Sequence, residues 1–147
     1  SELLDISDFD AAAQWLRDHE MDNYMGTKQA MCAYIAREAF ALLKQGVRIN
    51  AICPGPTDTP LAQANREMWL GGGADFRAAA GVEASVPMEQ AYPMAFLCSD
   101  AASAITGITQ VADLGWFNAG LVHSFPDASP MAEWILGRKL DLPAGSQ

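Results

Sequence analysis

The sequence contains no run of basic residues and no long uninterrupted apolar stretch. Its 147 residues include 9 Lys and Arg against 18 Asp and Glu, which gives a formal net charge of −9. Surfaces that bind nucleic acid are usually basic, so a phosphate-backbone partner is not expected. No apolar run approaches the roughly 18 residues that a membrane-spanning helix requires, and no signal peptide is recognisable. These absences predict a cytoplasmic protein with no nucleic-acid or membrane partner.

Cysteine and histidine are also scarce, with three and two residues respectively. Cys32, Cys53 and Cys98 lack the short spacings that are typical of metal and redox sites. We expect all three to be buried free thiols. His19 and His123 have no Cys or carboxylate partner at metal-ligand spacing, so no metal site is predicted.

The most informative stretch runs from Asp22 to Leu61 and begins with Tyr24 and Lys28 at the start of a long helical pattern. Residues four positions apart share one face of a helix, so the phenol and the ammonium are expected on the same side. A neighbouring ammonium stabilises the ionised phenol. The pair therefore predicts a tyrosine that works as a general acid or base. By itself this spacing is a weak signal, because the two residue types are common.

A predicted strand and a Pro-Gly turn follow this helix and make the Tyr24 and Lys28 spacing more specific. Gly46 is expected to end the helix, and the β-branched run Val47–Cys53 predicts a strand. The strand leads into the turn Pro54-Gly55-Pro56-Thr57-Asp58-Thr59. Ligands of open α/β sheets bind beyond the carboxyl ends of the strands, so this turn is a candidate binding loop. Thr59 taken alone is also explained as the N-cap of a following helix.

Together these features resemble the short-chain dehydrogenase/reductase family. Its Tyr-x-x-x-Lys motif corresponds to Tyr24 and Lys28, its Asn-x-x-x-Pro-Gly segment begins at Asn50, and its following threonine corresponds to Thr59. Residues 99–107 also match the turn that precedes the last strand of the family. The tyrosine motif is specific only because the strand and the Pro-Gly turn follow it.

The chain departs from the family pattern after its last strand, expected at roughly Ile108–Asp113. The family usually has Asp-Gly-Gly there, whereas this chain has Asp113-Leu114-Gly115. The backbone freedom of a glycine is lost at Leu114, which leaves the geometry of this turn open.

The resemblance implies an α/β protein with a Rossmann-like, doubly wound parallel sheet. It also implies an NAD(P)-dependent oxidoreductase that interconverts a secondary alcohol and a ketone, with NAD or NADP as its cofactor. Only two convincing strands are predicted, and the glycine-rich phosphate loop of the family is not found. Gly71–Gly73 follow no predicted strand and open no predicted helix, so they are expected to form a flexible loop. We therefore expect residues 1–147 to be the C-terminal part of one Rossmann-type domain, whose dinucleotide-binding half lies upstream.

The resemblance assigns roles to single residues. Tyr24 and Lys28 are the expected catalytic residues: Tyr24 transfers a proton to or from the substrate oxygen, and Lys28 supports it and holds the nicotinamide ribose. The backbone of Thr57 and the hydroxyl of Thr59 are expected to meet the nicotinamide carboxamide. The expected cofactor-binding set is Tyr24, Lys28, Pro54, Gly55, Thr57 and Thr59.

The catalytic serine of the family usually lies twelve or thirteen residues before the tyrosine, where this chain has Ala12 and Ala11. A subset of the family, similar to bacterial 3α-hydroxysteroid dehydrogenase/carbonyl reductases, has a helical insertion at this place. Residues 8–21 resemble that insertion and contain a helical pattern over 8–17. We therefore expect the serine upstream of residue 1, with Ser1 and Ser7 as the alternatives within the chain.

The segment Pro60–Pro87 resembles the substrate-binding loop of the family, and an irregular loop of that length is either functional or disordered. Met68 and Trp69 in this loop, and Trp116 after the last strand, are candidate substrate-binding residues. They either line a pocket or pack the loop onto the core. The insertion and this Met- and Trp-containing loop favour a bulky apolar carbonyl compound, and the resemblance to the subset named above implies a hydroxysteroid first.

Two further helices are expected: one over Met88–Ser99 despite Pro93, and a short amphipathic one over Pro130–Arg138. The long helix after Tyr24 carries two apolar stripes, where a helix on a sheet needs one. The resemblance and the second stripe predict a homo-oligomer, either a dimer or a tetramer. A non-catalytic binding or scaffold protein on the same fold remains an alternative, as does an inactive fragment.

Overall fold

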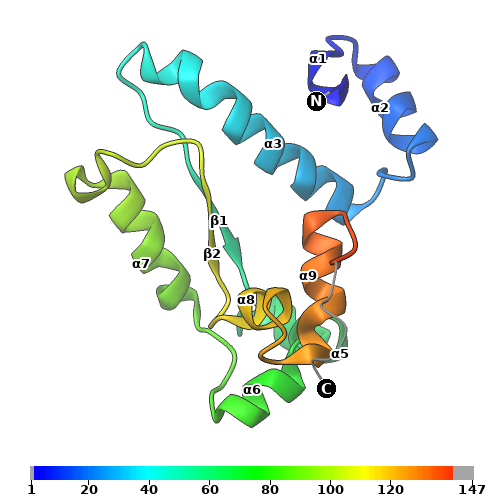
Figure 1. Ribbon diagram of the computed structural model, residues 1–147, viewed down its shortest axis with the longest axis vertical. Coiled ribbons are helices and arrows are strands. Elements are labelled where there is room, and N and C mark those ends of the chain that lie inside the picture. The colour runs from blue at the N-terminus through cyan, green and yellow to red at the C-terminus, as the bar shows by residue number, and fades with distance from the viewer. Residues whose placement is uncertain (1, 141–147) are drawn as a thin grey trace. The chain divides into compact units, whose positions relative to one another are not determined.

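The computed structural model describes residues 2–140, which form nine α-helices, two 3-10 helices and two β-strands (Figure 1). Contacts between Cα atoms divide the chain into two compact units. The first contains residues 2–51 and 97–110, and the second contains residues 52–96 and those from 111 onward.

The first unit begins with three helices, α1 (Glu2–Asp5), α2 (Phe9–Asp18) and α3 (Tyr24–Leu43). The helix expected over residues 8–17 is confirmed as α2. Its N-cap is Asp8, whose carboxylate accepts a hydrogen bond from the Ala11 amide at 2.8 Å. This contact satisfies one of the free N–H groups of the first helical turn.

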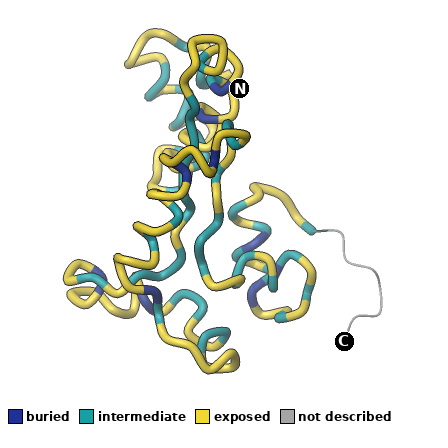
Figure 2. The backbone as a smooth tube through the Cα atoms, turned by 90° about the vertical axis from the view of Figure 1, so that its left-hand side faces the viewer, coloured by how far each residue is buried: buried dark blue, intermediate teal, exposed yellow. Residues whose placement is uncertain are grey.

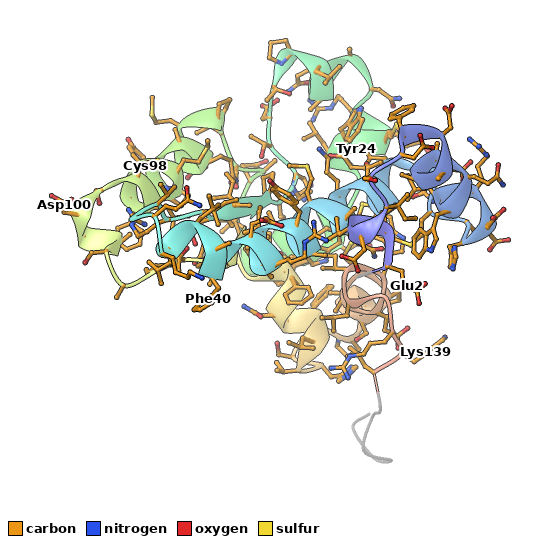
Figure 3. All side chains as sticks on the ribbon, turned by 90° about the horizontal axis from the view of Figure 1, so that it is seen from above. Glu2, Tyr24, Phe40, Cys98, Asp100 and Lys139 are labelled. Atoms are coloured by element: carbon orange, nitrogen blue, oxygen red, sulfur yellow. The ribbon has the colours of Figure 1, made fainter. Side chains whose placement is uncertain are left out.

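Helix α3 ends as predicted. Gly46 has a φ of 76°, the left-handed conformation that glycine adopts without strain, and the Val47 amide donates to the Leu42 carbonyl at 3.0 Å. Ile35 and Ala39 are buried on one face of α3. The second apolar stripe is exposed, and the side chain of Phe40, 73% exposed, projects away from the helix (Figure 3).

The strand expected over residues 47–53 begins later than predicted, since β1 spans Ala51–Pro54. Just before β1, the Ile49 carbonyl accepts from the Gly107 amide at 2.8 Å. The Ile49 amide, however, donates to Thr106 Oγ1 at 3.1 Å, and the Asn50 side chain donates to the Ile105 carbonyl at 3.0 Å, so the backbone pairing is not continuous there. A strand requires backbone-to-backbone pairs. The β-branched composition therefore extends further than the ladder does.

The second strand, β2 (Thr109–Ala112), lies where it was predicted and pairs with β1 in a two-stranded sheet (Figure 1). At one end the Ala51 amide donates to the Ile108 carbonyl, and at the other the Gly55 amide donates to the Ala112 carbonyl, both at 3.0 Å. Partners advance in the same direction along both strands, so the pair is parallel.

The segment expected to be an irregular loop, 60–87, is mostly helical, and this corrects the prediction. It contains α4 (Pro60–Ala64), α5 (Arg66–Leu70) and α6 (Ala74–Ala80). Each of these helices has seven residues or fewer, too short for a periodic sequence pattern. The glycine run also differs from the prediction, because Gly73 is the N-cap of α6.

The helices predicted over Met88–Ser99 and Pro130–Arg138 are confirmed as α7 (Pro87–Cys98) and α9 (Ser129–Leu136), whereas α8 (Trp116–Leu121) was not predicted. Helix α7 contains Pro93, and α8 and α9 come after β2. A 3-10 turn precedes β2 at Asp100–Ala102, and another precedes α9 at Pro126–Ala128.

Buried positions are few (Figure 2). The buried apolar residues of the first unit are Ile35, Ala39, Leu97 and Ala102, and those of the second are Ala62, Leu70, Ala128 and Ala132. The expectation of three buried thiols is wrong: Cys32 and Cys98 are exposed, and Cys53 is half-buried. Cys32 lies on the exposed stripe of α3, which no described residue of its unit covers.

Candidate active site

Tyr24 and Lys28 lie on the first turns of α3 with their side chains on the same side of the helix. Lys28 Nζ lies 5.1 Å from the centre of the Tyr24 ring, within the range of a cation–π contact. The Tyr24 side chain is 60% exposed at the start of the helix (Figure 3). The helix begins at this tyrosine because Asn23 is its N-cap and accepts from the Gly26 amide at 3.0 Å. The prediction that Tyr24 and Lys28 lie close together on one face of the helix is therefore confirmed.

The middle residue of the motif, Gly26, is buried because the preceding chain crosses it. A β-carbon on Gly26 would lie 2.0 Å from the carbonyl oxygen of Met21. Met21 is itself held by the end of α2, since its amide donates to the Leu16 carbonyl at 2.8 Å. Gly26 thus allows the α2–α3 connection to pack directly on the turn that presents the tyrosine.

In the second unit, the Pro54-Gly55 turn lies against the chain after β2. The Gly55 amide donates to the Ala112 carbonyl at 3.0 Å, and a β-carbon on Gly55 would lie 2.7 Å from the Cα of Asp113. Only a residue without a side chain fits this approach. The glycine of the motif is therefore required by packing, whatever the turn binds.

The two threonines of the turn have different hydrogen bonds. Thr57 Oγ1 donates to the Gly55 carbonyl at 2.9 Å, and the Asp58 amide donates to the Ser85 carbonyl at 2.7 Å. Thr59 Oγ1 accepts from the Ala62 amide at 3.1 Å and is the N-cap of α4. Because Thr59 uses its oxygen as the acceptor there, its hydroxyl hydrogen remains available to donate to a ligand.

The turn after β2 keeps a left-handed backbone although it has leucine in place of glycine. Leu114 has a φ of 63° and Gly115 a φ of 92°. The Asp113 carboxylate holds this turn, because it accepts from the Gly115 amide at 2.9 Å and from the Phe117 amide at 2.7 Å. These two charge-assisted hydrogen bonds offset the backbone strain at Leu114.

A small cavity lies in the second unit, with room for roughly one water molecule. Trp116, a candidate substrate-binding residue, is part of its wall, and so is Gly55 of the Pro-Gly turn. The other two candidates are not: Met68 is 66% exposed and Trp69 is 36% exposed. The full lining is Gly55, Pro56, Phe76, Arg77, Ser85, Asp113, Leu114 and Trp116.

The sequence reasoning did not identify Phe76 and Ser85 as lining residues. Phe76 lies in the segment that was expected to be a loop, and its position on α6 gives it this orientation. Ser85 is the buried polar residue of the described chain, at 4% exposure, and is brought to the turn by an isolated parallel bridge with Thr57. No local pattern marks such a bridge.

Of the two serines considered within the chain, Ser1 lies outside the described residues, and Ser7 is exposed between α1 and α2. His19 stacks on Trp15, with ring centres 3.8 Å apart, and His123 Nδ1 lies 2.9 Å from Ser129 Oγ. Residues 2–140 contain no group of three or more side chains that could hold a metal ion. None of the helices described combines the length and the hydropathy needed to cross a membrane.

Comparison with known proteins gives the sequence a family. Residues 7–117 match the family described as Enoyl-(Acyl carrier protein) reductase. The chain is 40% identical to the 3-alpha-hydroxysteroid dehydrogenase/carbonyl reductase of Comamonas testosteroni over 94 residues, which are 63% of this chain and 36% of that protein. It is 35% identical to a 3beta-hydroxysteroid dehydrogenase of Eggerthella lenta, again over 63% of this chain and 36% of the relative. A 3-alpha-(or 20-beta)-hydroxysteroid dehydrogenase of Mycobacterium tuberculosis is 30% identical over 90% of this chain and 48% of the relative.

A solved structure of 4-hydroxyisoleucine dehydrogenase complexed with NADH matches with a TM-score of 0.51 and 25% identity, over 61% of this chain and 37% of that chain. This match and the parallel strand pair confirm the predicted α/β, Rossmann-like fold class. The chain spans between about a third and a half of the length of the relatives named above. With three quarters of its residues inside the family match, the chain belongs to the short-chain dehydrogenase/reductase family.

Proposed function

We propose that the protein containing this chain is an NAD(P)-dependent oxidoreductase that interconverts a secondary alcohol and a ketone. The contact between Lys28 and Tyr24 carries the proposal, because it places an ammonium beside an exposed phenol on the first turns of α3. Family membership supports it further. The chain would supply the C-terminal part of the catalytic domain.

In this proposal Tyr24 is the proton donor and acceptor. In the reducing direction its hydroxyl gives a proton to the carbonyl oxygen of the substrate, and in the oxidising direction the phenolate removes the proton of the alcohol. The Lys28 ammonium stabilises the phenolate that forms when the proton leaves. When bound, the nicotinamide cofactor supplies or accepts the hydride.

By their chemistry, each of the proposed donors suits one group of a nicotinamide nucleoside. Among residues 2–140, no hydrogen bond or ion pair occupies the Lys28 ammonium, so its three N–H groups can bind the ribose hydroxyls. Thr59 retains a hydroxyl hydrogen for the carboxamide oxygen, and the backbone of Thr57 is assigned to the same group. Pro54 and Gly55 shape the turn that carries these donors.

The proposed substrate is a hydroxysteroid or another bulky apolar carbonyl compound. Three relatives named above are hydroxysteroid dehydrogenases. The apolar candidates Met68, Trp69 and Trp116 are consistent with such a substrate, and Met68 and Trp69 have exposed surface that a ligand could cover.

We also propose that the protein is a homo-oligomer. The exposed stripe of α3 carries Phe40, at 73% exposure, and Leu43, at 50%. Large apolar side chains that are exposed together on one helix face favour burial against another surface. We therefore propose that α3 contributes to the subunit interface. The oligomeric state is to be measured on the full-length protein.

The test uses the full-length protein that contains this chain. The wild type is expected to bind a nicotinamide cofactor and to turn over at least one member of a panel of steroid and cyclic ketones. Tyr24→Phe removes one oxygen and is expected to lower kcat by about 10²- to 10⁴-fold, the usual contribution of a general acid. Tm should change little.

Tyr34→Phe is the matched control, because Tyr34 is also a partly exposed tyrosine on α3, at 47% exposure. Its kcat should equal that of the wild type. Near-wild-type turnover by Tyr24→Phe would rule out the phenol as the acid. A wild type that neither binds cofactor nor turns over a ketone would favour a binding or scaffold protein on this fold.

A further inference from the structure

The residue before Tyr24 holds the first turn of α3 with both atoms of its side-chain amide. Asn23 Oδ1 accepts from the Gly26 amide at 3.0 Å, and Asn23 Nδ2 donates to the Glu20 carbonyl at 2.9 Å. The first bond satisfies one of the amides that the start of a helix leaves without a partner. The second bond reaches back along the chain to the end of α2. One side chain therefore joins the end of α2 to the start of α3.

The end of α2 is itself fixed. Glu20 has a φ of 55°, and the Met21 amide donates to the Leu16 carbonyl at 2.8 Å. A left-handed residue followed by such a bond is the Schellman pattern that closes the last turn of a helix. The Met21 carbonyl then packs on Gly26, where a β-carbon would lie 2.0 Å from its oxygen. Residues 21–23 are thus held at both ends.

The Tyr24 side chain depends on this turn for its direction. It is 60% exposed, so packing does little to orient the ring. The Tyr24 carbonyl accepts from Thr27 Oγ1 at 2.7 Å, and the Asn23 carbonyl accepts from the Thr27 amide at 3.2 Å. The backbone before and after the tyrosine is therefore bonded. All these contacts lie within the first unit, which also contains Lys28.

We propose that Asn23 is a positioning residue of the proposed reaction, because it fixes the first turn of α3 and with it the direction of the Tyr24 hydroxyl. Proton transfer requires the phenol oxygen within hydrogen-bond reach of the substrate oxygen. A displacement of about 1 Å can cost about 10²-fold in rate. Asn23 acts through Tyr24 and touches no reacting atom. The inference rests on the proposed function for the role of Tyr24, but the hydrogen bonds of Asn23 do not.

The test compares Asn23→Ala with Asp8→Ala in the full-length protein. Asp8 is the matched control, because it is the N-cap of α2 in the same unit and accepts from the Ala11 amide at 2.8 Å. Each variant loses one N-cap, so each should lower Tm by about 2–4 °C. Only Asn23→Ala is expected to lower kcat, by about 10- to 100-fold. Its KM for the ketone should change little.

A conservative variant should rescue the loss. Serine is also a good N-cap, and its hydroxyl oxygen can accept from the Gly26 amide. Asn23→Ser should therefore recover most of the kcat that Asn23→Ala loses. It also replaces Asn23→Ala if that variant does not fold, because it lacks only the donor to the Glu20 carbonyl. An Asn23→Ser enzyme as slow as Asn23→Ala would show that the cap on Gly26 does not position the tyrosine.

The same variants in a Tyr24→Phe background separate positioning from a general loss of structure. Without the phenol oxygen there is no proton donor left to orient. Asn23→Ala should therefore lower the residual kcat no further in that background, although its loss of Tm should persist. A role in stability alone would lower kcat by the same factor in both backgrounds.

A further readout does not depend on turnover. The Gly26 amide should exchange its hydrogen about fivefold faster in Asn23→Ala than in the wild type, because the cap is its acceptor. Asp8→Ala should leave this exchange unchanged. Equal exchange rates in Asn23→Ala and the wild type would overturn the premise that Asn23 fixes the turn.

The outcomes distinguish the two proposals. An effect of Asn23→Ala on kcat that persists in Tyr24→Phe, or that Asp8→Ala reproduces, would overturn the positioning role and leave the role of Tyr24 intact. A Tyr24→Phe enzyme as active as the wild type would contradict the proposed function, and the positioning role with it. A wild type without ketone turnover would also overturn both, and the Gly26 exchange would then report on the turn alone.

Discussion

Lys28 Nζ lies 5.1 Å from the centre of the Tyr24 ring at the start of α3, and this contact has a counterpart at the other end of the same helix. There, Lys44 Nζ lies 5.2 Å from the centre of the Phe40 ring. The two contacts pair an ammonium with an exposed aromatic ring at nearly equal distance. Only the Tyr24 ring carries a hydroxyl. The contact between Lys44 and Phe40 can therefore serve as a control for the effect of removing the Lys28 ammonium.

Lys28→Met and Lys44→Met should therefore cost similar stability and differ in cofactor binding. Each removes an exposed cation–π contact worth about 0.5–1 kcal/mol. Lys28→Met also removes the charged donor proposed for the nicotinamide ribose, a hydrogen bond worth roughly 1.5–3 kcal/mol. Cofactor affinity should consequently fall by about 10- to 100-fold in Lys28→Met alone. Equal affinities in the two variants, measured by titration of the full-length protein, would contradict the assignment.

Thr59 can be tested for its two roles separately. Thr59→Val removes the N-cap of α4 and should cost about 1 kcal/mol of unfolding free energy. Thr59→Asp keeps an oxygen that accepts from the Ala62 amide but has no hydroxyl hydrogen. It should unfold like the wild type and bind the nicotinamide cofactor more weakly. Wild-type affinity in Thr59→Asp would show that Thr59 acts as a cap only.

Leu114→Gly should stabilise the protein. A leucine with a φ of 63° carries left-handed backbone strain of about 1–2 kcal/mol. Glycine removes that strain but adds about 0.5–1 kcal/mol of unfolded-state entropy, so the net gain should be up to about 1.5 kcal/mol. Denaturant unfolding measures it.

The reverse substitution nearby is the control. Gly115 has a φ of 92°, and a β-carbon there meets no atom within 4 Å, so Gly115→Ala isolates the backbone strain. Its strain of about 1–2 kcal/mol is offset by about 0.5–1 kcal/mol of reduced unfolded-state entropy, so the unfolding free energy should fall by up to about 1.5 kcal/mol. A loss of stability in Leu114→Gly would mean that packing of the leucine side chain outweighs its backbone strain.

The site was predictable where its chemistry depends on neighbours in sequence. Tyr24 and Lys28 meet because they are four residues apart on a helix that Asn23 caps. The ends of α2 and α3 followed from Asp8 and Gly46 for the same reason. The wall of the cavity was not predictable, because Phe76 and Ser85 reach it through pairings of distant segments.

The incorrect predictions for the cysteines and for the glycine run also have physical causes. Cysteine is usually buried, but Cys32 lies on the stripe of α3 that its own unit leaves exposed. The glycine run was expected to be flexible because it follows no predicted strand and opens no predicted helix. Its backbone instead bears the Trp116 indole and caps α6. In both cases composition gave the average behaviour of a residue type, and the packing partner decided the outcome.

The amino-acid sequence alone determined the family, the helix that presents Tyr24 and Lys28, and the strand and turn that follow. These depend on hydrogen bonds and side-chain spacings within a few residues, which local sequence specifies. The tertiary structure alone decided that Gly55 lies against Asp113, that Leu114 adopts a left-handed backbone, and that Trp116 rests on Gly73. The two glycine contacts join segments tens of residues apart, and their energies exist only once the chain has brought those segments together. The Leu114 backbone is held by local bonds of Asp113, but a leucine does not by itself indicate a left-handed turn.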